Sequence, residues 1–223
     1  MNYSVFNCGS SRSFPEPHEF LDAGKPMEAG GADALVMIGL DAGDRLDAYR
    51  DAYPLVLVEL YTECLGVWTG EAAGAEGSHV LGFARFRMGD DAPSNLIELV
   101  RQPATPDGAV ANATALFEAA GFEVAVCMDQ AGRIIDRLVR PYFNEVLQRL
   151  DEGLATADDM DLTLKLGLGY PEGPVGLLER SGLAHHYDVT CALNEVYGTP
   201  AFAPARRAVV ANRRRKNQNS ENT

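Results

Sequence analysis

Residues 129–183 read DQAGRIIDRLVRPYFNEVLQRLDEGLATADDMDLTLKLGLGYPEGPVGLLERSGL and carry the strongest periodic pattern in the chain. Between residues 134 and 150, apolar side chains recur at steps of three and four, the spacing of one buried face of a helix in a bundle. Pro141 falls inside this pattern, so we expect the helix to bend there. The apolar positions are Ile134, Ile135, Leu138, Val139, Tyr142, Phe143, Val146, Leu147 and Leu150.

Further helical patterns follow toward the C-terminus. Thr156 is suited to cap a second helix, and Gly167 or Gly169 is suited to end it. The corner GYPEGP then redirects the chain into three shorter helical stretches, at residues 175–180, 183–197 and 201–212. Residues 213–223 are basic and polar, and we expect their end to fray. The sequence therefore predicts an all-α domain over residues 129–212, followed by a tail at 213–223.

The chain before residue 129 has the pattern of an α/β layer. Apolar runs at residues 33–40, 54–61 and 79–88 are typical of buried strands, and residues 42–53 have helical character. Thr105 and Pro106 are suited to begin a helix that Gly121 ends, and a strand is expected at 122–126. A short strand at 3–7 and a Gly/Ala-rich loop at 70–77 complete this domain, which we place at residues 1–128.

Charge and composition exclude several classes of protein. The 223 residues have a formal net charge of −13, and residues 1–205 alone hold 13 basic and 31 acidic side chains, a net charge of −18. Such a body repels a phosphate backbone, so no nucleic-acid binding is expected. No apolar run is long enough to span a membrane, and no secretory signal is visible. Four scattered cysteines (Cys8, Cys64, Cys127 and Cys191) favour buried thiols in a reducing cytoplasm over a metal or disulfide framework.

An ordered series of residues in the helical half resembles the C-terminal domain of the 3-hydroxyacyl-CoA dehydrogenase family. The resemblance extends from about residue 31 to residue 212, and it implies a truncated Rossmann-like sheet followed by a helical bundle like the C-terminal domain of 6-phosphogluconate dehydrogenase. The chain is similar to the second module of two-module bacterial members. The matching residues are Asp129, Gly132, Arg137, Pro141, Asn144, Glu145, Glu152, Gly153, Asp161, Lys165, Gly167, Pro171, Gly173 and Pro174.

The resemblance also implies where catalytic groups would stand. In that family a histidine takes the hydroxyl proton, a glutamate orients the histidine, and serine and asparagine side chains position the substrate. The resemblance places Ala84 at the histidine, Glu98 at the glutamate, Leu60 at the serine, Tyr61 beside it and Asp136 at the substrate-positioning asparagine. Only Glu98 keeps the family residue. No glycine-rich phosphate turn follows any predicted strand, so we expect no use of NAD, the family cofactor, by this chain alone.

Charged residues near these positions have two interpretations each. Glu98 either keeps a role in the site or is a surface carboxylate left after the site decayed. Arg85 and Arg87, with Tyr61, either bind a CoA phosphate or a carboxylated acyl tail, or they guard a solvated edge strand. Trp68 lines a pocket or belongs to the core.

Two further groups of charged residues lie in the helical half. Arg133, Arg137 and Arg140 recur at helical spacing, and we interpret them as a solvent face paired with Asp129 and Asp136. His185, His186 and Asp188 are too close in sequence for a catalytic triad. A surface helix accounts for them.

Three functions remain open. The first is a degenerate paralogue that binds acyl-CoA or a partner subunit without hydride transfer of its own. The second is an active NAD-dependent dehydrogenase of the 3-hydroxybutyryl-CoA type, in fatty-acid or aromatic-acid catabolism, with a non-standard or shared site. The third is a structural or regulatory dimerisation module with the Arg-rich tail as its contact element. The apolar stripe of the helical half predicts a homodimer, or a pair with a full-length dehydrogenase.

Overall fold

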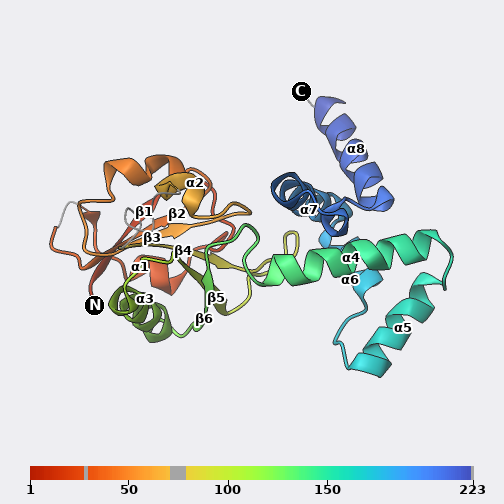
Figure 1. Ribbon diagram of the computed structural model, residues 1–223, viewed down its shortest axis with the longest axis horizontal. Coiled ribbons are helices and arrows are strands. Elements are labelled where there is room, and N and C mark those ends of the chain that lie inside the picture. The colour runs from red at the N-terminus through yellow and green to blue at the C-terminus, as the bar shows by residue number, and fades with distance from the viewer. Residues whose placement is uncertain (28–29, 71–78, 222–223) are drawn as a thin grey trace. The chain divides into compact units, whose positions relative to one another are not determined.

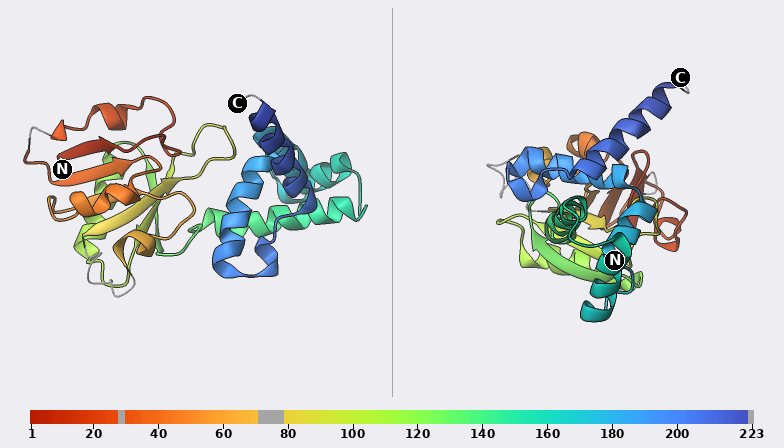
Figure 2. Two further views of the ribbon diagram at one scale, coloured as in Figure 1. Left: turned by 90° about the horizontal axis from the view of Figure 1, so that it is seen from above. Right: turned by 90° about the vertical axis from the view of Figure 1, so that its right-hand side faces the viewer.

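The computed structural model describes residues 1–27, 30–70 and 79–221, and Figures 1 and 2 show its ribbon. Most of the predicted Gly/Ala-rich loop at 70–77 lies outside the described residues. The chain folds as two compact units. One comprises Met1–Arg87 and Ala92–Ile134, and the other comprises Met88–Asp91 and Ile135–Thr223. We call them the sheet unit and the helical unit.

The sheet unit contains one six-stranded sheet whose strands follow one another in sequence order. The first four strands are parallel, β5 runs antiparallel to β4, and β6 is parallel to β5. This mostly parallel α/β sheet, followed by helices, confirms the predicted fold class. The strands are β1 (Tyr3–Asn7), β2 (Ala34–Ile38), β3 (Val56–Glu59), β4 (Val80–Arg85), β5 (Leu96–Arg101) and β6 (Glu123–Met128).

Both faces of the inner strands β2 to β4 are covered, which explains why these strands are continuous apolar runs. Alternate residues of β2 enter two different cores: Val36 belongs to one and Met37 to the other. The helices α1 (Glu19–Asp22) and α3 (Asp107–Ala119) pack on the first core, whereas the 3₁₀ helix η2 (Gly43–Ala48) and α2 (Gly66–Thr69) pack on the second. In Figure 1, α3 lies below the sheet and α2 above it.

Trp68 on α2 belongs to this second core, as the core interpretation predicts. Its ring lies so close to the backbone of Gly43 that a Cβ there would come within 2.1 Å of it. The predicted helix over residues 42–53 is only the short η2. The helix α3 begins one residue later than predicted, because Thr105 uses its hydroxyl to accept the Gln102 N–H instead of capping the helix.

The N-terminal segment is a reduced strand–helix–strand unit. After β1 the chain makes a loop, the one-turn helix α1 and a single parallel bridge from Lys25 to Ser4 on the outer side of β1. A Rossmann sheet has the strand order 3-2-1-4-5-6, and removal of its second and third strands leaves the order 1-4-5-6. The four parallel strands β1 to β4 match this order, and Lys25 makes a single bridge on the outer side of β1.

The helical unit begins with α4 (Ile135–Asp151), which contains Pro141. Phe143, Val146 and Leu147 of the predicted apolar stripe are buried on it, whereas Leu138 is exposed. Thr156 caps α5 (Ala157–Leu168), and Gly169 ends it in the left-handed conformation, as predicted. The remaining helices are α6 (Pro174–Ser181), α7 (Leu183–Tyr197), η4 (Pro200–Phe202) and α8 (Arg206–Glu221).

The C-terminal residues that were expected to fray belong to α8, which continues to Glu221. Two aspartates of the motif series cap helices. Asp129 accepts the N–H groups of Leu65 and Gly66 at the start of α2, and Asp161 accepts those of Val175 and Gly176 at the start of α6. Carboxylates at helix N-termini satisfy donors that have no partner inside the helix. These motif positions therefore serve the fold.

Candidate functional site

The positions that the resemblance assigns to the base and its glutamate lie opposite each other in the sheet. The antiparallel register of β4 and β5 pairs Ala84 directly with Glu98. Side chains at opposed positions share one face of a sheet and lie about 4.5–5.5 Å apart at Cβ. A histidine at position 84 would therefore meet the Glu98 carboxylate. Ala84 supplies only a methyl group, which accepts no proton.

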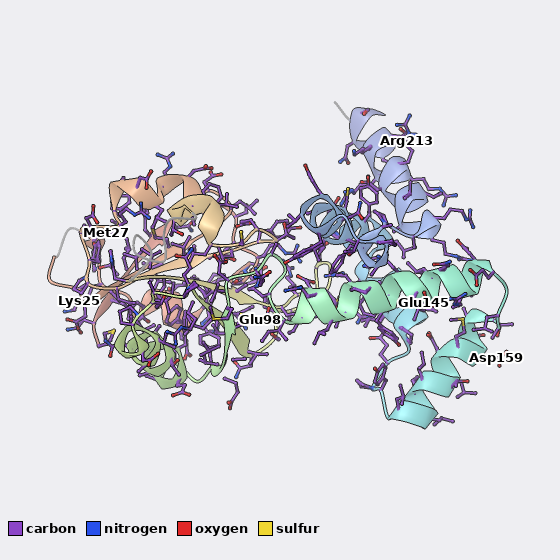
Figure 3. The ribbon with its side chains drawn as sticks, in the orientation of Figure 1. Lys25, Met27, Glu98, Glu145, Asp159 and Arg213 are labelled. Atoms are coloured by element: carbon purple, nitrogen blue, oxygen red, sulfur yellow. The ribbon has the colours of Figure 1, made fainter. Side chains whose placement is uncertain are left out.

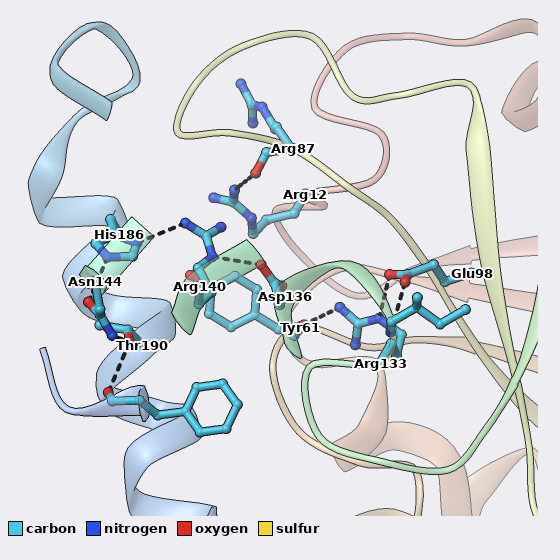
Figure 4. Close-up of polar contacts among 12 residues, drawn as sticks. Arg12, Tyr61, Arg87, Glu98, Arg133, Asp136, Arg140, Asn144, His186 and Thr190 are labelled. Atoms are coloured by element: carbon cyan, nitrogen blue, oxygen red, sulfur yellow. Dashed lines mark hydrogen bonds and ion pairs between the residues drawn. The ribbon is translucent and has the colours of Figure 1, made fainter. Parts of the chain in front are cut away.

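Glu98 is buried, so its interpretation as a surface carboxylate was wrong. Only 2% of Glu98 and 6% of Arg133 are exposed, and Arg133 Nε lies 3.4 Å from Glu98 Oε2. The other carboxylate oxygen accepts the Ile134 N–H at 2.9 Å, and Arg133 Nη2 donates to the Tyr61 carbonyl at 2.7 Å. Figure 3 shows Glu98 among the side chains of the sheet unit, and Figure 4 shows these bonds. The partner of this carboxylate is therefore an arginine.

Leu60 and Tyr61, which follow β3, contribute no serine-like or asparagine-like group. Leu60 is buried in the core on the same face as Ala84. The half-buried Tyr61 holds Arg133 through its carbonyl, and the guanidinium of Arg12 lies 5.3 Å from its ring centroid. This distance is typical of a cation–π contact. Tyr61 therefore helps to hold the ion pair, whereas Leu60 belongs to the core.

Arg85 is a structural residue within the sheet unit. Its strand, β4, lies between β3 and β5, so the interpretation of a solvated edge strand was wrong. Its guanidinium donates to the carbonyls of Ser13, Pro93 and Ser94 and lies about 5 Å from the ring centroids of Phe14 and Phe122, and burial lowers its pKa. The half-buried Arg87 lies beyond the end of the strand, where its carbonyl accepts a bond from Arg12.

A second buried polar network crosses the helical unit. Asp136, which the resemblance places at the substrate-positioning asparagine, accepts a bond from Arg140 Nε at 2.7 Å, and Arg140 Nη1 lies 3.3 Å from His186 Nδ1. His186 Nε2 lies 2.9 Å from Asn144 Oδ1, and the Asn144 amide donates to Thr190 Oγ1 at 2.8 Å (Figure 4). The network ties α4 to α7.

Burial and the nearby Arg140 cation lower the pKa of His186 to about 3. Only 1% of His186 is exposed, so its assignment to a surface helix was wrong. His185 does lie partly exposed, 3.5 Å from Asp90, and Asp188 pairs with Arg215. These neighbours form no catalytic triad.

The predicted basic stripe does not form one solvent face. Arg133 and Arg140 are buried, whereas Arg137 is exposed with its guanidinium 4.8 Å from the Tyr197 ring centroid. The pairing of Arg140 with Asp136 is confirmed. Asp129 instead caps α2, as described above.

Glu59 is a functional candidate that the sequence analysis missed. It ends β3, is 7% exposed, and accepts the backbone N–H groups of Ser13 and Gly39, each at 2.7 Å. The only sequence signal for it is a carboxylate that directly follows the apolar run LVLV. Its two donors lie in the loops after β1 and β2, so neither is adjacent in sequence.

The described residues contain no cluster of three or more metal-ligating side chains, and the four cysteines are free. Burial raises the pKa of the Cys8 and Cys127 thiols to about 11, and the Glu98 carboxylate contributes to the increase at Cys127. Both thiols are therefore protonated near neutral pH, which disfavours a nucleophilic role. Each helix of the described chain is too short or too polar to cross a membrane.

Comparison with known proteins identifies the helical unit. Residues 132–222 match the family model described as the C-terminal domain of 3-hydroxyacyl-CoA dehydrogenase. Human mitochondrial hydroxyacyl-coenzyme A dehydrogenase is 35% identical over 88 residues, which are 40% of this chain and 28% of that enzyme. A 3-hydroxybutyryl-CoA dehydrogenase of Mycobacterium tuberculosis is 28% identical over 144 residues, 64% of this chain and 50% of that enzyme. The chain thus spans half or less of these relatives.

The likeness of fold extends further along the chain. The crystal structure of (S)-3-hydroxybutyryl-CoA dehydrogenase from Ralstonia eutropha has a TM-score of 0.67 and 22% sequence identity, and the match covers 83% of this chain and 67% of that one. The 3-hydroxybutyryl-CoA dehydrogenase from Escherichia coli has the same TM-score and identity, with 84% of this chain and 42% of that one covered. At this identity the likeness establishes the fold alone.

The buried ion pair leads to a prediction about stability. We expect Arg133→Met to lower the free energy of unfolding by about 3–5 kcal/mol, because it leaves Glu98 buried without its cation. Urea unfolding at pH 7 measures the loss. The control is Arg149→Met, which removes exposed pairs with Glu145 and Glu152 and should lower the free energy of unfolding much less. Equal losses in the two variants would contradict the assignment.

The depressed pKa of His186 predicts a pH dependence. His186 stays neutral in the folded state down to about pH 3 but takes up a proton near pH 6.5 when unfolded. The unfolded state therefore binds more protons between these values. We expect stability to fall as the pH drops below about 6.5, by about 1.4 kcal/mol per pH unit from this group.

Unfolding by urea at pH 7.5 and pH 5.5 checks this expectation. His186→Gln should remove the contribution, whereas His185→Gln, at the neighbouring exposed position, should keep it. An unchanged pH slope in His186→Gln would show that another group is responsible.

Proposed function

We propose that this chain is a redox-inactive relative of the 3-hydroxyacyl-CoA dehydrogenases. The relationship rests on residues 132–222, which match the model of the C-terminal domain of that family. The function of the chain, in this proposal, is association through the helical unit. The observation that carries the first part is the pairing of Ala84 with Glu98, whose carboxylate is bound by Arg133.

Oxidation of a hydroxyl by hydride transfer needs a base within hydrogen-bond reach of the hydroxyl proton. At the site described above, Ala84 has no acceptor, and the Glu98 carboxylate already binds Arg133 and the Ile134 N–H. His79 does not substitute, because its Nε2 lies 2.6 Å from the Arg50 carbonyl before β4 begins. This arrangement supports the proposal that the protein has the fold of these dehydrogenases but does not carry out the proton transfer.

The exposed face of α5 supports the association. This twelve-residue helix has no buried residue, yet it carries Leu162 and Leu166, which are 53% and 79% exposed. Residues four apart lie on one face of a helix, so the two leucines form a continuous apolar strip. Figure 1 shows α5 apart from α7 and α8 of the same unit. An exposed apolar strip of this kind is typical of an interaction surface.

A second copy of the chain suits this strip. A two-fold interface brings the same surface of each copy together, so α5 would pair antiparallel with its counterpart. Leu162 lies at the middle of α5, where the two-fold axis would pass, and the exposed Asp159 of one copy would approach Lys165 of the other. The helix is thus complementary to itself in both apolar character and charge.

We expect no formation of NADH when the protein is mixed with NAD and a 3-hydroxybutyryl-CoA substrate. Absorbance at the NADH band measures it, with a full-length 3-hydroxyacyl-CoA dehydrogenase as positive control. The same assay with both proteins together tests a shared site, and it should show only the rate of the control. Turnover by the chain alone, or a rate that it increases, would refute redox inactivity.

Light scattering tests the association. We expect a particle of twice 24.0 kDa at micromolar concentration. Burial of one leucine is worth about 1.5–3 kcal/mol, so Leu162→Glu and Leu166→Glu should each weaken the dimer about tenfold or more. Leu138→Glu adds the same charge at an exposed leucine of α4 and should leave the dimer intact. A monomer at all concentrations, or equal effects of the three variants, would overturn the assignment of α5.

A further inference from the structure

The turn after β1 is the place where a dinucleotide-binding fold offers backbone N–H groups to a pyrophosphate. In this chain, side chains of the protein already bind those donors. The Gly9 N–H donates to Asn7 Oδ1 at 3.0 Å, and the Phe14 N–H donates to Ser11 Oγ at 2.8 Å. The Ser13 N–H donates to Glu59 Oε1 at 2.7 Å.

Glu59 joins this turn to the next one along the sheet edge. Its second oxygen accepts the Gly39 N–H, directly after β2, at 2.7 Å. The carboxylate thus bridges the loops at the carboxyl ends of β1 and β2 from the end of β3, where open α/β sheets bind their ligands. Bonds from N–H groups to a carboxylate are stronger than neutral ones.

The remaining space at this edge is small. A cavity lined by Arg12, Gly39, Leu40, Glu59 and neighbouring residues holds about 10 Å³. That volume accommodates a single water molecule at most. The helix α1, which follows the turn, has four residues and begins only at Glu19, so it presents no helix N-terminus to a phosphate. The residues present therefore do not fit NAD.

We infer that Glu59 is an internal anion that occupies the place of a nucleotide pyrophosphate and closes the crevice to dinucleotides. This inference rests on the proposed function, since it gives redox inactivity a second and independent cause. It also specifies a latent site. Removal of the Glu59 side chain beyond Cβ exposes the N–H groups of Ser13 and Gly39 in a space of carboxylate size, which suits formate or acetate.

Thermal unfolding of the full chain with added anions tests the latent site. We expect Glu59→Ala to melt several degrees below the unaltered protein in sodium chloride. Sodium formate or acetate, at the same ionic strength, should restore part of the loss. The control is Glu145→Ala, which removes an exposed carboxylate that pairs with the Arg149 side chain. The melting temperature of this control, like that of the unaltered protein, should be the same in chloride and in formate.

Two outcomes would overturn the inference. One is a Glu59→Ala variant that melts like the unaltered protein or responds equally to chloride and formate. The other is saturable binding of NADH to the unaltered protein, measured by NADH fluorescence without any substrate. If Glu59→Ala does not fold, Glu59→Gln replaces it in the test. Glutamine has the size of glutamate, but its NH2 group then faces one of the two backbone N–H donors and cannot accept a hydrogen bond from it. This variant should then melt below the unaltered protein, and an unchanged melting temperature would count against the inference.

These readouts separate the inference from the proposed function. Binding of NADH without turnover would overturn the closed crevice and leave redox inactivity intact. Turnover with a substrate would refute redox inactivity, whatever the anion response of Glu59→Ala.

Discussion

The ion pair between Glu98 and Arg133 joins three parts of the sheet unit that are distant in sequence. Glu98 lies on β5, Arg133 lies in the segment that leads toward α4, and the Tyr61 carbonyl belongs to the loop after β3. A buried charge without a partner costs several kcal/mol, so each member requires the other. The φ angle of Arg133 is +50°, which is uncommon for a residue other than glycine, and the bonds to Glu98 and Tyr61 hold it there. This buried pair thus holds distant parts of the sheet unit together.

The two carboxylates of the sheet unit have parallel roles. Glu98 is bound where a base would need it, and Glu59 is bound where a phosphate would need the backbone. In both places a charged side chain of the chain itself takes the partners that a ligand or a catalytic group would use.

The sequence predicted the elements that depend on local pattern. The helical period around Phe143 and the caps at Thr156 and Gly169 are properties of adjacent residues, and the strands at 33–40 and 54–61 are continuous apolar runs. The buried polar contacts depend on residues far apart in sequence. His185 and His186 look alike in the sequence, and only packing against Arg140 and Asn144 of another helix distinguishes them. Arg133 has the spacing of a surface stripe, yet its partner lies 35 residues earlier.

The reduced N-terminal segment has a consequence for the outer edge of the sheet. Among the described residues no full strand lies on the outer side of β1, so its backbone donors and acceptors could pair with the sheet of another molecule. The single bridge from Ser4 to Lys25 covers part of that edge, and Pro26, which follows, has no N–H with which to extend the pairing. Lysine and proline at an edge are residues with which natural sheets resist edge-to-edge aggregation. The shortened fold thereby keeps its sheet from growing between molecules.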